Sequence, residues 1–177
     1  MRLLFDIEAN ELLEKATKMH CIVAKDIDTK EVFKFYGDQT VAGDHGSLDD
    51  GVWWLGQAEE LIGHNIIGYD VPLVRKLYDV DLRGKHMVDT LALSKTLNAD
   101  RPIPMGMPSP VNPLTGKKER YGPHSLGAWG FRLGRFKPEW HDWAEFSPGM
   151  LHRCAEDVEI NYLVYLALMK ELNGLKQ

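Results

Sequence analysis

The chain has 177 residues, of which 44% are hydrophobic and 27% are charged, an ordinary composition for a globular domain with a substantial core. No apolar run approaches the length of a membrane span, and Asp6 comes too early for a signal peptide, so we expect a cytoplasmic protein. Cys21 and Cys154 have neither the spacing of a zinc site nor the number needed for a disulfide framework.

The formal net charge of −5 argues against a general nucleic-acid binder, but the charge is unevenly distributed. Residues 101–140 have a net charge of +5, and their basic residues are Arg101, Lys117, Lys118, Arg120, Arg132, Arg135 and Lys137. This stretch could be a solvated loop, or it could follow the backbone of a single nucleic-acid strand.

The first part of the chain predicts strands over residues 3–7, 21–26 and 31–36, with a hairpin turn at 28–30 between the last two. A capping-box spacing that begins at Ser47 predicts a helix that ends near residue 61. Residues 60–64 predict a short fourth strand.

Further along, Pro72 opens a predicted second helix, and residues 86–88 predict a fifth strand that leads into a helix through residues 91–97. Residues 100–123 are rich in proline and glycine and predict a long loop. Residues 125–133 predict a helix that Gly134 ends, and Ser147-Pro148 predicts the start of a long final helix. This order of elements predicts an α/β domain with a mixed sheet flanked by helices.

Asp6 and Glu8 lie two residues apart on the first predicted strand, so their carboxylates point to the same face. Two buried carboxylates repel each other unless a cation lies between them, and hard oxygen ligands favour Mg²⁺ or Mn²⁺. Acid-x-acid triplets are common by chance in a chain with 26 acidic residues. Taken alone, the pair could equally be solvated at a strand edge.

Two more acidic residues lie where a site could form. Asp70 follows the fourth predicted strand, and sites of open α/β sheets gather at strand ends, although Asp70 alone could be an ordinary helix cap before Pro72. Asp157 lies at the margin of the apolar stripe of the final helix, where it could instead pair with Arg153.

These segments together resemble the three motifs of the DEDD superfamily of 3′–5′ exonucleases. The matching segments are Phe5-Asp6-Ile7-Glu8, then His64-Asn65 with Tyr69-Asp70, then His152-x4-Asp157. Within that superfamily the chain is most similar to the proofreading domain of family A DNA polymerases of short-tailed phages, which Asp6–Asn10, His86–Leu91 and Gly122–Gly134 also resemble. The resemblance runs from residue 1 to about residue 172 and is poor only across residues 36–60.

The resemblance implies a ribonuclease H-like fold and hydrolysis of single-stranded DNA 3′ ends to 5′-mononucleotides, in phage DNA replication or proofreading. It implies two Mg²⁺ or Mn²⁺ ions per site, held by Asp6, Glu8, Asp70 and Asp157, with Asp6 bridging both. Two such ions about 3.5–4 Å apart clamp the attacking and leaving oxygens of an in-line displacement.

The same resemblance implies that His152 takes the proton of the attacking water, as a neutral imidazole can near pH 7. The predicted substrate-binding residues are His64, Asn65, Tyr69, Lys117, Lys118 and Arg120. His64 and Asn65 could equally be turn residues.

Two departures from the polymerase pattern stand out. That branch has a tyrosine four residues before the last aspartate, and here the position is Arg153, whereas His152 fits the histidine of the other branch. Five residues span roughly 140° on a regular helix, so His152 must lie at the helix start or in a bend to share a site with Asp157. The chain also ends where a polymerase domain would begin. We therefore expect residues 1–177 to be one exonuclease domain, either free-standing or acting with a separate polymerase subunit.

Two other functions are compatible with these residues. An RNA-trimming 3′–5′ exoribonuclease would share every catalytic residue. A non-catalytic accessory subunit of a split polymerase would most simply lack one or more of the four acids, and all four are present.

Overall fold

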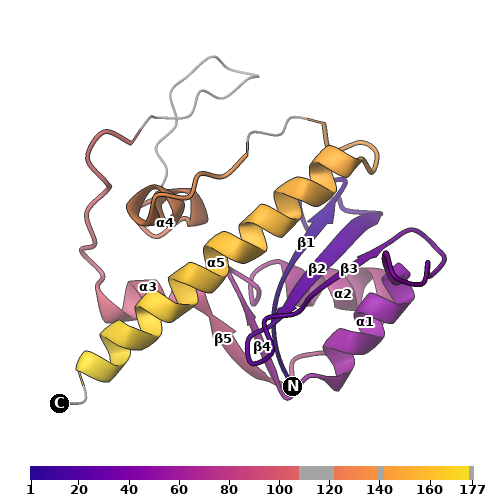
Figure 1. Cartoon of the computed structure of the whole chain (residues 1–177), viewed down its shortest axis with the longest axis horizontal. Coiled ribbons are helices and arrows are strands. Elements are labelled where there is room, and N and C mark those ends of the chain that lie inside the picture. The colour runs from indigo at the N-terminus through magenta and orange to yellow at the C-terminus, as the bar shows by residue number, and fades with distance from the viewer. Residues whose placement is uncertain (108–121, 139–141, 176–177) are drawn as a thin grey trace.

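Five strands form one sheet in the order β3-β2-β1-β4-β5 (Figure 1). They are β1 (Arg2–Ala9), β2 (Met19–Asp26), β3 (Val32–Tyr36), β4 (Glu60–Gly63) and β5 (His86–Asp89). β2 is antiparallel to both β1 and β3, while β4 is parallel to both β1 and β5. The mixed sheet predicted from the sequence is confirmed. The structure is a computed structural model, and it describes residues 1–107, 122–138 and 142–175.

Helices cover both faces of the sheet because β1 and β2, at its centre, are buried on both sides. On one face, Leu3 and Phe5 of β1 belong to a core cluster with residues of α1 (Leu48–Gln57) and α2 (Asp70–Tyr78). On the other face, Leu4 packs in a cluster with Val158 of α5 (Pro148–Gly174), the long helix that crosses the sheet in Figure 1. A third cluster joins the second half of α5 to α3 (Thr90–Leu97) and α4 (Leu126–Leu133).

The helix ends follow local capping more closely than apolar periodicity. Ser47 and Asp50 form the predicted capping box of α1, but the helix ends at Gln57, before the predicted end, because the following chain is extended and enters β4. α2 begins at Asp70, two residues before Pro72. The Ser147 side chain accepts a hydrogen bond from the backbone N–H of Met150, so α5 starts where the sequence predicts. Within the described ranges, no helix is long and apolar enough to cross a membrane.

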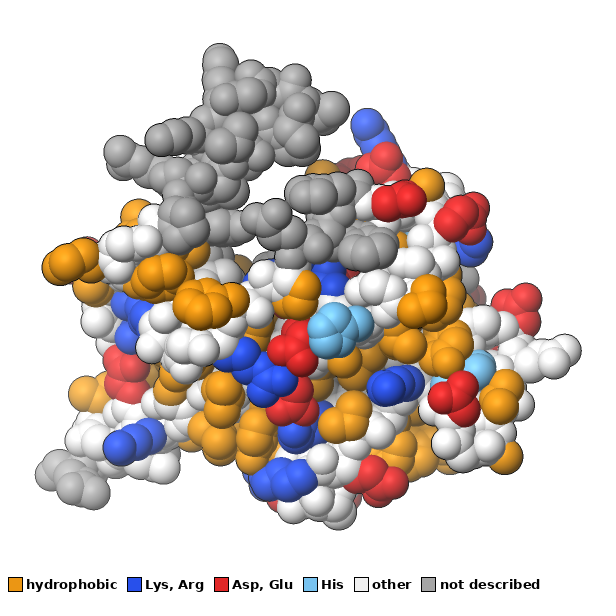
Figure 2. All heavy atoms as spheres, turned by 45° about the horizontal axis from the view of Figure 1, so that its top comes forward, with side chains coloured by type: hydrophobic (Ala, Val, Ile, Leu, Met, Phe, Trp, Pro, Cys, Tyr) orange, Lys and Arg blue, Asp and Glu red, His pale blue; other side chains and the backbone are white. Residues whose placement is uncertain are grey.

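Positive charge does not form one continuous area on the face shown in Figure 2, where basic and acidic side chains are interspersed. The described basic residues of the 101–138 stretch explain part of this pattern. Arg101 pairs with Glu171 at 2.8 Å, Arg135 with Glu156 at 2.9 Å, and Lys137 with Asp157. The predicted strand-binding residues Lys117, Lys118 and Arg120 lie outside the described residues.

Candidate active site

Asp6 and Glu8 point from β1 toward α5, on the opposite face from Phe5 and Ile7. The Cys154 side chain of α5 lies directly against this position, with its Sγ 3.4 Å from the backbone oxygen of Asp6 and 3.6 Å from Asp6 Oδ2. The strand alternation expected from the sequence therefore puts both carboxylates between the sheet and the final helix.

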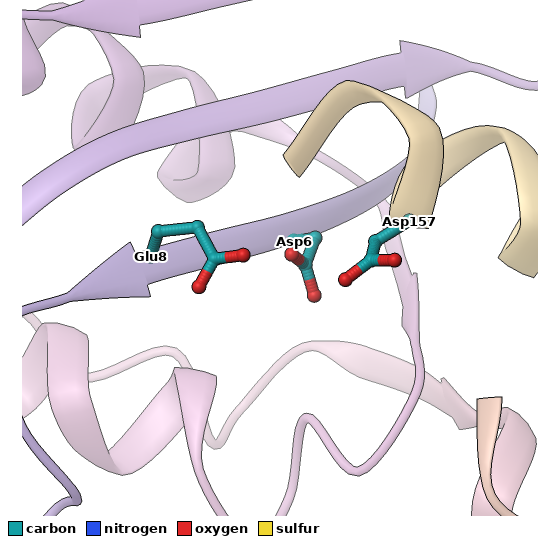
Figure 3. Close-up of side chains that lie close together, drawn as sticks. All are labelled: Asp6, Glu8 and Asp157. Carbon is teal, nitrogen blue, oxygen red and sulfur yellow. The ribbon is translucent and has the colours of Figure 1, made fainter. Parts of the chain in front are cut away.

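Asp157 completes a group of three carboxylates. Asp6, Glu8 and Asp157 each offer an oxygen, and these oxygens all lie within 4.8 Å of one another (Figure 3). Asp157 is only 2% exposed, and its Oδ1 is buried without a hydrogen-bond partner among the described residues. An unpaired buried carboxylate oxygen is costly, and a cation bound there would remove that cost. The chemistry and spacing of these oxygens fit a divalent metal.

Asp70 lies beside this group, but one of its carboxylate oxygens is hydrogen-bonded to the backbone of β1. It is the first residue of α2 and is 3% exposed, and its Oδ1 accepts a hydrogen bond from the backbone N–H of Ile7 at 3.1 Å. Burial is the largest cause that raises the pKa of Asp70 well above its usual value, and the negative charge of Asp6 raises it further. Three of the four predicted ligands are thus gathered, and the fourth is close enough for its charge to interact with Asp6.

The pKa values of the cluster reflect repulsion and burial. Partial burial, with the charge of Asp157, raises the pKa of Asp6 from 3.8 to about 7. Burial and the charge of Asp6 raise the pKa of Glu8 from 4.5 to about 8. Without a cation between them, these groups hold protons near neutral pH. A divalent ion would favour their charged forms.

Two basic side chains approach the cluster from outside. The Lys137 ammonium pairs with Asp157 Oδ2, and the Arg153 Nε lies 3.4 Å from Glu8 Oε1. The sequence marked Arg153 by its spacing from Asp157, but nothing in it indicated that Lys137 would reach a carboxylate twenty residues further along the chain.

The structure does not bring His152 to this group. α5 runs from Pro148 to Gly174, so His152 lies in its second turn, and its side chain is exposed. Its charge interacts with Glu156 instead. In this structure Arg153 contacts Glu8, whereas the His152 side chain is exposed, and its role as general base stays a prediction.

The predicted substrate-binding residues His64, Asn65 and Tyr69 all make hydrogen bonds within the protein. His64 Nδ1 lies 2.9 Å from Thr90 Oγ1, and burial lowers the pKa of His64 to about 4, so this side chain is neutral and part of a buried network. Asn65 has a φ of +68°, and its backbone N–H donates to Asp89 Oδ1, which fits the interpretation of Asn65 as a turn residue. Tyr69 donates its hydroxyl to the backbone oxygen of Glu11 at 2.9 Å.

A groove of about 810 Å³ begins at the cluster. Its lining residues come from the end of β1, the loop that follows, α2 and the segment before α5: Glu8, Ala9, Asn10, Glu11, Leu12, Tyr69, Asp142, Trp143 and Ala144. Leu12 is 72% exposed and provides an apolar surface at the groove. Trp143 was not singled out from the sequence, because only the packing of its segment against α5 brings it to the site.

Comparison with known proteins adds independent information. No protein-family model matches the sequence. The chain is 38% identical over 152 residues to a DNA-directed DNA polymerase of Enterobacteria phage T3, a match that covers 79% of this chain and 20% of the polymerase. It is 37% identical over 145 residues to the DNA-directed DNA polymerase of Escherichia phage T7, covering 77% of this chain and 20% of that one. The predicted similarity to phage polymerases is confirmed, and the chain spans about a fifth of their length.

Solved structures support the fold. A nuclease in its apo form superimposes with a TM-score of 0.59 at 17% identity, covering 97% of this chain and 72% of that one. A product-bound exonuclease I gives a TM-score of 0.52 at 17% identity, covering 95% and 42%. The predicted ribonuclease H-like α/β fold is confirmed.

Proposed function

We propose that this chain, which its motifs, its polymerase relatives and its fold assign to the DEDD superfamily of 3′–5′ exonucleases, removes mononucleotides from the 3′ end of single-stranded DNA. The observation that carries the proposal is the meeting of Asp6, Glu8 and Asp157, about 150 residues apart in the sequence, beside a groove that Glu8 lines. A solvated strand edge would not gather these side chains around a buried, unpaired oxygen.

The proposed cofactor is Mg²⁺ or Mn²⁺, with two ions per site. Asp6, Glu8 and Asp157 would hold them, with Asp70 close to Asp6. When bound, such ions stabilise the attacking and leaving oxygens of a phosphoryl group. Hard carboxylate oxygens suit these ions better than softer metals.

The groove limits what can reach the cluster. Its volume of about 810 Å³ suits one terminal nucleotide better than a folded duplex. In the proposed pose, Leu12 and Tyr69 contact the terminal base or sugar, and the last phosphodiester lies near Glu8. Water oxygen bonds to that phosphorus and the bond to the 3′ oxygen breaks. A proton from water ends on the 3′ oxygen of the shortened strand, and a 5′-mononucleotide leaves.

The test is a time course on single-stranded DNA labelled at its 5′ end, with the full chain and Mg²⁺ or Mn²⁺. We expect a ladder of products that shorten one nucleotide at a time, no reaction in excess chelator, and none with Asp157→Asn. Asp49→Asn, which alters an exposed acid on α1, is the matched control and should retain full activity. Turnover that persisted in excess chelator would exclude the metal mechanism.

The choice of DNA over RNA rests on the similarity to DNA-directed DNA polymerases. We accordingly propose a role in phage DNA replication or proofreading in the host cytoplasm, with a separate polymerase subunit as partner. Matched DNA and RNA strands of one sequence separate the alternatives. Faster hydrolysis of the RNA strand would favour the exoribonuclease.

A further inference from the structure

Arg153 stands out because it is a cationic side chain in direct contact with Glu8, one of the three clustered carboxylates. Its side chain is 14% exposed, and its Nε lies 3.4 Å from Glu8 Oε1. That Nε is buried and makes no hydrogen bond to any described residue. An always-charged group in this position cannot accept a proton from water, so its role must differ from that of a base.

The guanidinium is held in place from its outer side. Its Nη1 donates to the backbone oxygen of Pro138 at 2.6 Å, and its carbon lies 5.1 Å from the ring centroid of Trp143. Trp143 is itself anchored, since His20 Nε2 lies 3.0 Å from its backbone oxygen. These contacts fix the direction of the guanidinium before any ligand arrives, which lowers the entropy cost of binding one.

Arg153 contacts Glu8 through Nε alone, so the carboxylate does not bind two nitrogens of the guanidinium at once. Arg135 offers a comparison. Its Nε and Nη2 both donate hydrogen bonds to the Glu156 carboxylate, at 2.9 and 3.0 Å, which is the bidentate geometry typical of a structural ion pair. Arg153 makes only the longer contact of Nε with Glu8. An ion pair built for stability alone would be expected to use the fork, as Arg135 does.

We propose that Arg153 binds the phosphate of the last phosphodiester, the one that is cleaved. The two residues that flank its guanidinium, Glu8 and Trp143, both line the groove, so a strand whose 3′ end fills the groove passes beside Arg153. A planar guanidinium matches the oxygens of a phosphate, and its charge stabilises the additional negative charge of the transition state. This inference rests on the proposed function, because it assumes that a strand end occupies the groove.

The experiment compares two short single-stranded DNA oligonucleotides that carry a 5′ fluorophore. They differ only in the last linkage, which is an ordinary phosphodiester in one and an uncharged methylphosphonate in the other. Binding to the full chain is measured by fluorescence anisotropy in excess chelator, so no strand is cut. The variants are Arg153→Met, which keeps an apolar stem against Trp143, and Arg153→Lys, which keeps the charge beside Glu8. Arg135→Met is the matched control.

Arg153→Met should weaken binding of the phosphodiester strand roughly ten- to a hundredfold, the value of a charged hydrogen bond, and leave binding of the methylphosphonate strand nearly unchanged. Arg153→Lys should fall between Arg153→Met and the unaltered chain, and Arg135→Met should match the unaltered chain on both strands. If Arg153→Met folds poorly, Arg153→Lys still tests the inference, because a purely structural role would affect both strands equally. An equal loss on both strands, or no loss, would overturn the assignment.

The two proposals fail separately. If the unaltered chain hydrolyses DNA with Mg²⁺ while Arg153→Met binds both strands normally, the exonuclease stands and the role of Arg153 is wrong. If the unaltered chain hydrolyses neither DNA nor RNA while the loss remains specific to the charged linkage, the phosphate site stands and the nuclease assignment is wrong.

Discussion

Replacement of Asp6 by asparagine should stabilise the metal-free protein while abolishing its activity. The carboxyl group of Asp6 has its pKa raised from 3.8 to about 7, chiefly by burial and by the charge of Asp157. A carboxyl group with a raised folded-state pKa disfavours folding once it ionises. This unfavourable contribution to the free energy of folding is absent below about pH 4, grows as pH rises, and is complete above about pH 7.

The magnitude follows from the size of that rise. A shift of about three pKa units at about 1.4 kcal/mol each limits the effect to roughly 4 kcal/mol at pH 8. Asp6→Asn cannot ionise and keeps an oxygen opposite Cys154. Its free energy of unfolding should therefore exceed that of the unaltered chain by an amount that grows by up to about 4 kcal/mol from pH 4 to pH 8.

Urea denaturation in excess chelator, repeated at several pH values, measures this difference directly. Asp49→Asn serves as the control, because an exposed acid should show no such trend. Added Mg²⁺ should stabilise the unaltered chain and have little effect on Asp6→Asn, since binding to the folded state alone raises stability. A difference between the two proteins that stayed constant from pH 4 to pH 8 would refute the electrostatic reasoning.

Three further predictions concern Lys137 at the cluster, the buried network of Thr90, and His152. Lys137→Met removes the ammonium that pairs with Asp157, so half-saturation by Mg²⁺, followed by tryptophan fluorescence, should occur at a lower concentration; an unchanged titration would show that Lys137 does not compete with the ion. Thr90→Val leaves Asn161 Oδ1 and His64 Nδ1 without their 2.7 and 2.9 Å partner and should cost about 1–3 kcal/mol in urea denaturation, and a neutral result would contradict the buried network. His152→Ala should keep most of the hydrolysis rate at neutral pH, because the side chain is exposed; loss of most of the rate would restore His152 as the general base.

Much of the fold was predictable because its signals are local. An apolar run of strand formers identified β1, the two-residue spacing of Asp6 and Glu8 put them on one face, and Ser147 with Pro148 identified the start of α5. The apolar stripe of α5 also indicated that Asp157 lies near the buried side, and it is 2% exposed. Each of these inferences needs only neighbours within one strand or one helical turn.

The parts of the site that escaped prediction depend on contacts between distant segments. The approach of Lys137 to Asp157 and of Trp143 to Arg153 follows from how the segment before α5 folds back on the helix, and no periodicity encodes that path. His152, which the motif spacing favoured, has an exposed side chain in the second turn of α5, and its role as general base stays a prediction. Motif spacing identified the right helix but could not decide which of two adjacent residues faces β1.

α5 connects two parts of the molecule that have different tasks. Near its start it carries Asp157, and about 16 Å further along the axis Leu168 packs in the cluster with α3 and α4. A tilt of about 4° around that distant contact would move the Asp157 carboxylate by about 1 Å, and displacements of that size can cost a hundredfold in rate. Residues such as Leu93 and Leu97, in that distant cluster, therefore help to hold the Asp157 carboxylate in place through the stiffness of one helix. Libraries that probe the proposed activity should include that remote packing layer alongside the groove.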